Sequence, residues 1–185
     1  MKKELRIQAT TNKLITTIHK ANFYYITPIF NLIQNCSKSG YFNNIYLLPR
    51  YQAGLALQLF SILLLGKIRL PNGIWYKATL YVISHKSMFV GFALIRSLVP
   101  SGSAQEIYMC AVKEKHRGNG FGKQLIQSIL NNGENISIIE AECLPKSVHM
   151  KRLLCRLGFK SVKSRKTTNL LNIAEKFRLS FQRGI

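Results

Sequence analysis

Hydrophobic and polar positions divide the first part of the chain into elements of different kinds. Residues 50–65 are apolar on nearly all sides, which predicts a helix packed beneath other elements, with peripheral membrane contact as the lesser alternative. Helical spacing runs through residues 12–36 and is expected to break near Pro28. Residues 4–10 fit a first strand, and the polar cluster at 37–44 predicts a turn.

The second part of the chain alternates between strand-like and helix-like patterns. Residues 75–84 and 88–98, joined by 85–87, predict a β-hairpin. The remaining elements are expected in the order strand 106–112, helix 121–130, strand 136–143, helix 147–157, and final strands at 159–162 and 177–181. A C-terminal cap is expected at 131–133 and turns are expected at 71–73 and 100–103. The sum is a mixed α+β domain with a central sheet and helices on its faces.

Length and composition describe a globular protein. The chain has 185 residues, 47% hydrophobic and 18% charged, which fits one domain with a sizeable core. No apolar run is long enough to cross a bilayer comfortably. We expect a cytoplasmic protein with reduced thiols and no metal site, because no secretory signal is apparent and the cysteines show no ligand spacing. The cysteines are Cys36, Cys110, Cys143 and Cys155.

Charge is distributed very unevenly. The net charge is +20, aspartate is absent, and no acidic residue occurs between Glu4 and Glu106. Five of the seven glutamates fall between Glu106 and Glu142, and Glu175 is the only one after Pro145. The basic flanks would attract a polyanion: tRNA, the ribosome, an acidic protein or anionic lipid. The alternative is an ordinary solvated basic surface.

A glycine-rich turn separates the strand at 106–112 from the helix at 121–130. Gly118, Gly120 and Gly122 allow backbone N–H groups to approach a ligand closely, because no Cβ stands in the way. The start of a helix adds unpaired N–H donors and the positive end of its dipole. With Arg117 and Lys123 on either side, the turn suits a pyrophosphate.

This turn resembles a known family signature. Arg117-Gly118-Asn119-Gly120-Phe121-Gly122 is similar to the R/Q-x-x-G-x-G/A motif of the GNAT superfamily of acyl-CoA-dependent N-acyltransferases. Residues 106–112 resemble the matching strand of its histone acetyltransferase branch, and 141–145 with 153–159 resemble ribosomal-protein acetyltransferases. The resemblance covers residues 75–181, while 1–74 match only in the order of elements. It implies a single GNAT-like domain over 1–185, with a mixed sheet of about six or seven strands flanked by helices.

The resemblance also implies how the donor, acetyl-CoA, would bind. Two central strands splay apart, and the pantetheine arm pairs with the exposed backbone of Cys110, Ala111 and Val112. The pyrophosphate would lie in the turn, and a further phosphate contact is implied for Lys123. The residues of the turn are Arg117, Gly118, Asn119, Gly120, Phe121 and Gly122.

Acyl transfer to an amine needs a base, because an amine must be neutral to attack. The resemblance places Glu106 at the position of the catalytic glutamate, and its apolar neighbours would raise its pKa. The alternative is a structural glutamate paired with a lysine of the basic flanks. Many GNAT enzymes have a tyrosine as the acid where this chain has Leu154, so that route is closed. Tyr108 shares the side of Glu106 by alternation, unless a bulge intervenes.

Several other residues have two readings. We expect Cys110 to be a buried structural thiol rather than a nucleophile. Glu140 and Glu142 share one side of a strand and predict either an acidic patch for a basic acceptor or pairs with Lys151 or Arg152. Ser147 stands where related enzymes often have asparagine, and it can cap the helix that follows.

The leading hypothesis is an acetyl-CoA-dependent N-acetyltransferase that transfers acetyl directly to an amine, with Glu106 as base. A basic surface repels a histone-like tail, so an acceptor carried on RNA, such as a ribosomal protein in its particle or an aminoacyl-tRNA, fits the charge better. One alternative is a noncatalytic nucleic-acid or ribosome-binding protein with this fold. Another is a longer-chain acyltransferase served by acyl carrier protein, which the pyrophosphate turn disfavours.

Overall fold

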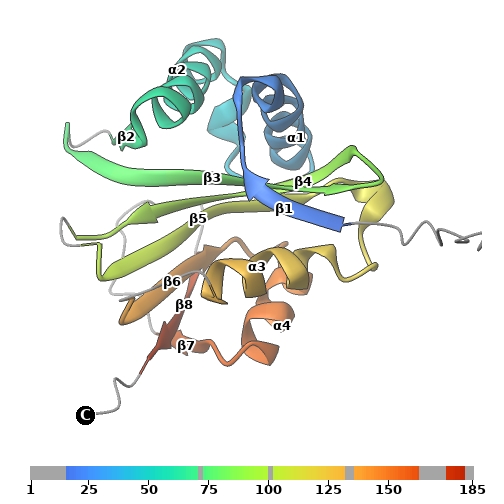
Figure 1. The fold of residues 1–185 in the computed structure, drawn as a ribbon, viewed down its shortest axis with the longest axis vertical. Coiled ribbons are helices and arrows are strands. Elements are labelled where there is room, and N and C mark those ends of the chain that lie inside the picture. The colour runs from blue at the N-terminus through green and yellow to red at the C-terminus, as the bar shows by residue number, and fades with distance from the viewer. Residues whose placement is uncertain (1–15, 71–72, 100–101, 132–135, 163–173, 182–185) are drawn as a thin grey trace, which may run out of the picture.

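The computed structural model describes residues 16–70, 73–99, 102–131, 136–162 and 174–181, and the elements below are those of these residues (Figure 1). The helices are α1 (Ile26–Lys38), α2 (Pro49–Leu65), α3 (Phe121–Asn131) and α4 (Val148–Arg156). Short 3-10 turns occur at η1 (Phe23–Tyr25), η2 (Asn44–Leu47) and η3 (Glu114–His116). The strands are β1 (Thr16–Lys20), β2 (Lys67–Arg69), β3 (Trp75–His85), β4 (Met88–Ser97), β5 (Ala104–Val112), β6 (Ile138–Cys143), β7 (Lys160–Val162) and β8 (Glu175–Ser180).

These strands form one mixed sheet. Its order is β1-β3-β4-β5-β6-β8-β7, with β2 attached to β3, and the described strands number eight. Only the β5–β6 pair among them is parallel. The predicted α+β class with a central mixed sheet is confirmed, and the structure adds β1 and the short β2 to the strands expected from the pattern.

The hairpin at the centre of the sheet matches its prediction. Lys86 and Ser87 link β3 to β4 with φ of 50° and 61°. Positive φ at both central residues is the geometry of a tight two-residue hairpin turn, whose twist suits the flanking strands. β4 then presents a continuous apolar run on both faces, because helices cover the sheet above and below it.

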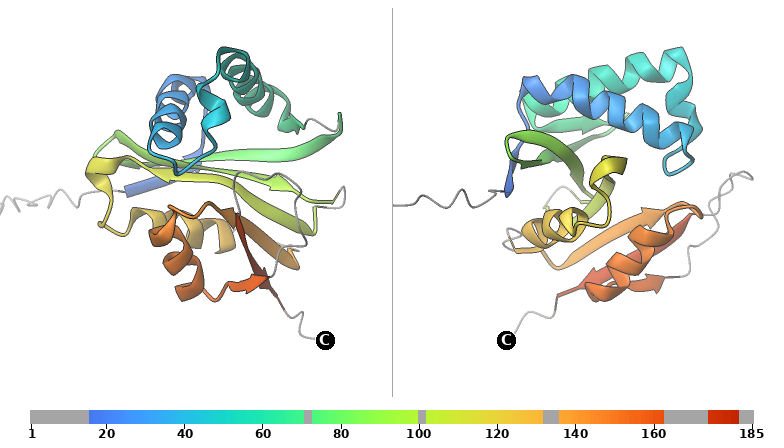
Figure 2. Two further views of the ribbon diagram at one scale, coloured as in Figure 1. Left: turned by 180° about the vertical axis from the view of Figure 1, so that it is seen from behind. Right: turned by 90° about the vertical axis from the view of Figure 1, so that its right-hand side faces the viewer.

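The parallel pair separates part-way along its length. β5 and β6 pair from Ala104↔Ile138 to Ile107↔Ala141, and β5 then continues alone on that side to Val112. A bulge accompanies the separation: Leu94 of β4 pairs with Met109, but Ile95 pairs with Ile107, so that Tyr108 is the extra residue. Figure 2 shows the β6–β8–β7 part of the sheet turning away from β3–β5. The structure therefore has the splayed strand pair that the resemblance implies.

Two hydrophobic cores lie on opposite faces of the sheet. The upper core packs α1 and α2 against β3, β4 and β5, and the lower core packs α3 and α4 against β4, β5, β6 and β8 (Figures 1 and 2). Ile29, Leu59 and Phe92 are fully buried in the upper core. Leu125 and Phe177 are nearly or fully buried in the lower one. The site described below is built around β5, whose side chains contribute to both cores.

Three expectations about the first part of the chain require correction. Thr16–Lys20 is a strand and not a helix, because it pairs with the free edge of β3. Pro28 does not break α1, since it lies in the first turn, where its missing N–H is not needed. α2 is not buried under other elements: Leu57 is 72% exposed and Leu64 is 69% exposed. The predicted strand at 4–10 and the cap at 132–133 lie outside the described residues. No helix among the described residues meets the length and hydropathy needed to span a membrane.

Candidate active site

Glu106 lies on β5, just before the strand pair separates, and it is 7% exposed. Its register partner on β4 is Arg96. Arg96 Nε donates to Glu106 Oε2 at 2.6 Å, and Nη2 lies 2.5 Å from the same oxygen. The partner is therefore an arginine of the neighbouring strand rather than a lysine from the flanks. The ion pair fixes the carboxylate on the upper face of the sheet.

Aromatic rings hold Arg96 in place. Its guanidinium carbon lies 4.8 Å from the centre of the Tyr108 ring and 5.7 Å from that of Tyr76. Tyr108 in turn hydrogen-bonds Tyr46 of η2, and burial raises the pKa of the Tyr46 phenol. Tyr108 thus shares the side of Glu106, as predicted, and the bulge changes the alternation only after it. This cluster joins β5 to the segment between α1 and α2.

The surroundings raise the pKa of Glu106. Burial is the largest cause, since it disfavours the charged form, and the Glu142 carboxylate acts in the same direction. Arg96 and Lys176 oppose this change but do not cancel it. The carboxyl therefore holds a proton at higher pH than a free glutamate does, which is the property required of a general base.

Glu140 does not form the acidic patch that its sequence position allowed. Arg178 donates to Glu140 Oε1 from Nε at 2.8 Å and from Nη2 at 2.6 Å, and Lys176 Nζ lies 2.6 Å from Oε2. Burial alone would raise the pKa of Glu140, but these hydrogen bonds and charges outweigh it and lower that pKa. Two cations from β8 thus neutralise this carboxylate. The expected lysine, Lys151, pairs with Glu175 instead, at 2.9 Å.

The glycine turn has the predicted open geometry. Gly118 and Gly120 have φ of 82° and 77°, a region that L side chains rarely adopt, and a Cβ at either would meet no atom within 4 Å. Asn119 Nδ2 donates back to the carbonyls of His116 (3.3 Å) and Arg117 (3.4 Å), which closes the turn. α3 begins directly after it, so the turn and a helix start occur together, as predicted.

The cations beside the turn have different roles. Arg117 Nε donates to the Val112 carbonyl at 3.2 Å, and its guanidinium carbon lies 4.7 Å from the centre of the Tyr41 ring. Its side chain therefore joins the end of β5 to the segment after α1. Lys123 is exposed in the first turn of α3. At Gly122, within α3, a Cβ would make only an ordinary contact with Leu153 of α4, at 3.6 Å from its Cδ2, so the packing of the two helices does not require glycine there.

The predicted backbone site occupies the unpaired part of β5. Cys110, Ala111 and Val112 all follow Ile107, the last residue of β5 paired to β6. Burial raises the pKa of the Cys110 thiol to about 12, which favours the protonated, structural thiol that the sequence predicts. Gly91 of β4 lies against this segment: a Cβ there would stand 2.4 Å from the Ala111 carbonyl oxygen. Only glycine permits this close approach.

Residues of α4 contribute no acid at the position that many family members use. Leu154 is fully buried in the lower core. His149 and Cys155 are exposed on the same helix. Ser147 precedes α4 but makes no side-chain cap; its hydroxyl donates to the Tyr41 carbonyl at 3.5 Å instead. The predicted capping role of Ser147 is therefore wrong.

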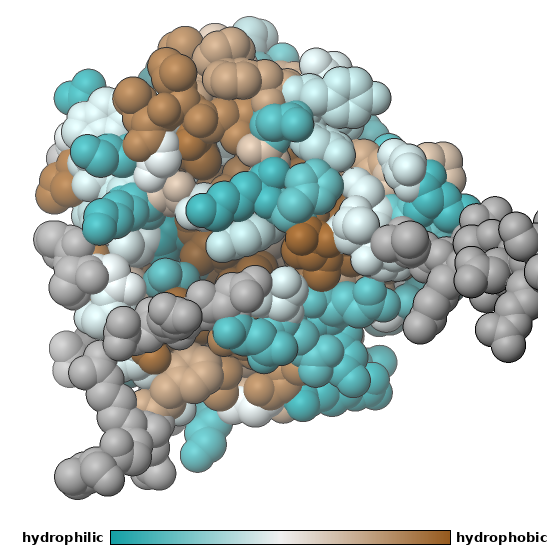
Figure 3. Space-filling view, in the orientation of Figure 1, coloured by the Kyte–Doolittle hydropathy of each residue, from teal (hydrophilic) through white to brown (hydrophobic). Residues whose placement is uncertain are grey.

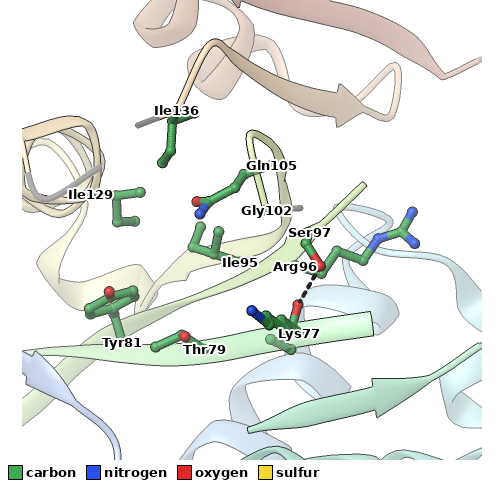
Figure 4. Close-up of a pocket in the computed structure, with 11 residues that line it drawn as sticks. Lys77, Thr79, Tyr81, Ile95, Arg96, Ser97, Gly102, Gln105, Ile129 and Ile136 are labelled. Atoms are coloured by element: carbon green, nitrogen blue, oxygen red, sulfur yellow. Dashed lines mark hydrogen bonds between the residues drawn. The ribbon is translucent and has the colours of Figure 1, made fainter. Parts of the chain in front are cut away.

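A separate cavity of about 190 Å³ lies on the lower face of the sheet. Its lining includes Lys77, Tyr81, Gln105 and Ile129, and Figure 4 shows the Arg96 side chain pointing away from it. A hydrogen bond from Ser97 Oγ to the Lys77 carbonyl, 3.3 Å long, borders the cavity. Arg96 is also a lining residue, but neither Glu106 nor the glycine turn is, so the cavity adjoins the candidate active site at Arg96 and does not contain its carboxylate.

Three residues of the site were not singled out by the sequence pattern: Arg96, Tyr46 and Gly91. A signal existed for Arg96, because an arginine within an otherwise apolar strand needs a buried partner. The partner lies near the loop that joins β4 to β5, because Ser97 pairs with Gln105 and Arg96 with Glu106, and the bulge at Tyr108 comes only beyond this pair. No local pattern marks Tyr46, which reaches the site through tertiary contacts alone.

A mixed sheet with a splayed parallel pair, a glycine turn at a helix start and a buried carboxylate beside the gap defines an acyl-CoA-dependent N-acyltransferase fold. The sequence model of the acetyltransferase (GNAT) family matches residues 66–159, and the chain belongs to this family. Sequence comparison with curated proteins finds no significant match.

Solved structures share this fold at low sequence identity. An acetyltransferase from Thermus thermophilus is 12% identical with a TM-score of 0.66, covering 91% of this chain and 98% of that one. A Salmonella typhimurium protein assigned as an acetyltransferase, solved with its cofactor acetyl-CoA, is 16% identical with a TM-score of 0.67, covering 92% and 96%. A ribosomal L7/L12 alpha-N-protein acetyltransferase in complex with coenzyme A is 14% identical with a TM-score of 0.66, covering 89% and 93%.

Proposed function

We propose that this chain transfers the acetyl group of acetyl-CoA directly to an amine, with Glu106 as the general base. The observation that carries the proposal is the place of Glu106: a buried carboxyl with a raised pKa, next to Ile107, where β5 and β6 cease to pair. Membership of the acetyltransferase family supports the reaction type. Arg96 is a positioning residue that holds Oε2.

The residues present fit acetyl-CoA as the donor substrate. The unpaired backbone of Cys110–Val112 would accept the pantetheine arm, and the open turn from Gly118 to Gly122 with Lys123 would accept the phosphates. Each charge-assisted hydrogen bond from an N–H group to a phosphate contributes about 1.5–3 kcal/mol, so several together reach micromolar affinity. Two of the fold neighbours were solved with acetyl-CoA or coenzyme A, which supports the same assignment.

The chemistry follows from the geometry of the site. Glu106 takes a proton from the ammonium form of the acceptor, and the neutral nitrogen attacks the thioester carbonyl carbon. A C–N bond forms and the C–S bond breaks, and the proton that the acylated nitrogen still carries passes to the leaving thiolate of coenzyme A. Leu154 supplies no hydroxyl to relay this proton, so we assign the relay to a water molecule, which takes the proton from the nitrogen and gives one to the sulfur.

For the acceptor we propose an amine carried on protein or RNA. A net charge of +20 favours an acceptor attached to nucleic acid over a free basic peptide. Close to Glu106, the carboxylate of Glu140 is balanced by Lys176 and Arg178, so it offers no acidic patch to attract a basic acceptor. The basic flanks, rather than the surroundings of Glu106, would then select the carrier of the amine.

The test is incorporation of label from radioactive acetyl-CoA into fractionated cell extract, with wild type, Glu106→Gln and the exposed control Glu114→Gln. We expect label in the ribosomal or tRNA fraction, a loss of about 10²–10⁴-fold in rate for Glu106→Gln, and little change for the control. Acetyl-CoA affinity by calorimetry should be similar in all three. Equal rates for the two variants would remove Glu106 from the mechanism.

The noncatalytic alternative predicts a different result. A protein that only binds RNA or ribosomes would label no fraction, and Glu106→Gln would leave its binding unchanged. The carrier-protein alternative predicts transfer from an acyl carrier protein but poor use of acetyl-CoA. The glycine turn disfavours it, because a carrier protein lacks the diphosphate that the turn suits.

A further inference from the structure

α2 presents an apolar surface to solvent. Leu57, Phe60 and Leu64 are 72%, 53% and 69% exposed, and Leu65 is 56% exposed. Phe23 of η1 extends this surface, since its ring centre lies 5.2 Å from that of Phe60 and it is 49% exposed. We call these five residues the α2 face. Figure 3 shows hydrophobic surface gathered over α2 at the top of the molecule.

The α2 face is a contiguous patch and not a set of isolated exposed side chains. Scattered apolar side chains are normal on a protein surface, but a contiguous patch marks a binding surface. α2 forms the upper layer together with α1 (Figure 1), and the space-filling view shows the α2 face protruding at the top of the molecule rather than lining a groove (Figure 3). A convex apolar helix surface fits a broad, deformable partner better than a narrow one.

Cations border the α2 face at both ends of the helix. Arg50 is exposed in the first turn of α2, and Lys67 and Arg69 are exposed on β2, directly after it. β2 is fixed beside the helix because Ser61 Oγ donates to the Lys67 carbonyl at 2.9 Å and Gln58 Nε2 donates to the Arg69 carbonyl at 3.3 Å. The sequence from residue 5 to 105 contains no acidic residue. The surface is thus apolar in its centre and purely cationic at its edge.

We propose that the α2 face binds the surface of an anionic lipid bilayer, with α2 lying in the interface. Leucine and phenylalanine side chains enter the acyl boundary, and the bordering cations meet the headgroup phosphates. A second copy of this chain fits poorly, because two surfaces of equal positive charge would meet. Nucleic acid supplies the negative charge but gives exposed leucines no apolar partner. An anionic membrane provides both the apolar partner and the negative charge.

The test is co-sedimentation of the full chain with vesicles of phosphatidylcholine alone, or of equal parts phosphatidylcholine and phosphatidylglycerol. We expect binding to the mixed vesicles only, and a loss of at least about ten-fold for the pair Leu57→Ser with Leu64→Ser, because each leucine loses its apolar transfer free energy. Both residues are exposed, so the variant should keep its thermal unfolding midpoint. The matched control is Met88→Ser, which removes an apolar side chain that is 50% exposed on the β3–β4 hairpin.

Three results would overturn the proposal. The serine pair could bind mixed vesicles as well as the wild type, which would reduce the attraction to charge alone. The wild type could fail to bind mixed vesicles at low salt. Sedimentation equilibrium could show a wild-type dimer that the serine pair dissociates, which would assign the α2 face to a second copy.

Discussion

The pKa of Glu106 depends on its burial and on two charged neighbours that are close in space but distant in sequence. Arg96 is ten residues away in sequence and directly opposite in the sheet, while Glu142 comes from the parallel strand on the other side. Burial raises the pKa of Glu106, and Arg96 limits the increase. A general base must be deprotonated before it acts and must bind the proton that it takes, and a moderately raised pKa serves both requirements.

The pH dependence of acetyl transfer should report this carboxyl. We expect kcat/KM to rise with pH through a midpoint above the value of about 4.3 typical of a free glutamate, because Glu106 acts only when deprotonated and its pKa is raised. Glu106→Gln should remove this limb from the pH–rate profile measured with saturating acetyl-CoA. A limb that persists in the glutamine variant would belong to another group.

Replacing Arg96 should change both stability and the pH profile. Arg96→Met leaves Glu106 buried without its cation, so we expect about 3 kcal/mol of destabilisation at neutral pH. The pKa of Glu106 rises further, so the deficit should shrink as the pH falls below that pKa and the neutral acid needs no partner. Urea unfolding at neutral and mildly acidic pH measures this. The exposed Arg152→Met is the control, and an equal deficit at both pH values would contradict the argument.

Gly91 tests the close approach of β4 to the proposed donor-binding segment. Gly91→Ala places a Cβ 2.4 Å from the Ala111 carbonyl oxygen, so the backbone of β4 or of β5 must move to relieve the clash. We expect about 1–3 kcal/mol of destabilisation and weaker acetyl-CoA binding. Gly54→Ala in α2 meets no atom within 4 Å and should instead stabilise by up to about 1 kcal/mol. Thermal unfolding and calorimetry of both variants distinguish the two positions.

At the scale of elements, the turn between η3 and α3 is a local structure that the sequence specifies almost completely. Gly120→Ala should weaken acetyl-CoA binding by at least about ten-fold, since its φ of 77° is strained for alanine and the N–H groups of the turn would shift. Gly102→Ala has the same φ of 77° in a distant loop and is the matched control. It should show a similar loss of stability with unchanged affinity. Equal affinity in both variants would place the phosphates elsewhere.

Strand pairing, in contrast, is not local. β1 reads as helical in sequence but becomes a strand because β3 offers it an unpaired edge. α2 reads as a buried helix because nearly all its positions are apolar, yet only Leu55, Leu59 and Ile62 are buried. Periodicity reports how apolar a helix is on each side, and it does not report how many neighbours the fold provides.

At the scale of the whole molecule, the charge of +20 predicts salt-sensitive association with polyanions. Binding to tRNA should fall by at least about ten-fold between about 50 and 200 mM salt, because each neutralised phosphate releases counterions. Filter binding across a salt series measures the slope. Glu106→Gln should bind tRNA as the wild type does, and binding that is insensitive to salt would exclude the basic flanks as the contact.

The sequence by itself determined the order of most strands and helices from residue 75 onward, the glycine turn before α3, and the family. Each of these depends on neighbours within a few residues: alternation, glycine spacing and the start of a helix. Tertiary structure alone decided which charges pair: Arg96, rather than a lysine, forms the ion pair with Glu106. Lys176 and Arg178 form ion pairs with Glu140. Tertiary structure also decided that α2 keeps an apolar side exposed to solvent. Those outcomes depend on the register between neighbouring strands and on which surfaces meet, and neither is encoded in a local pattern.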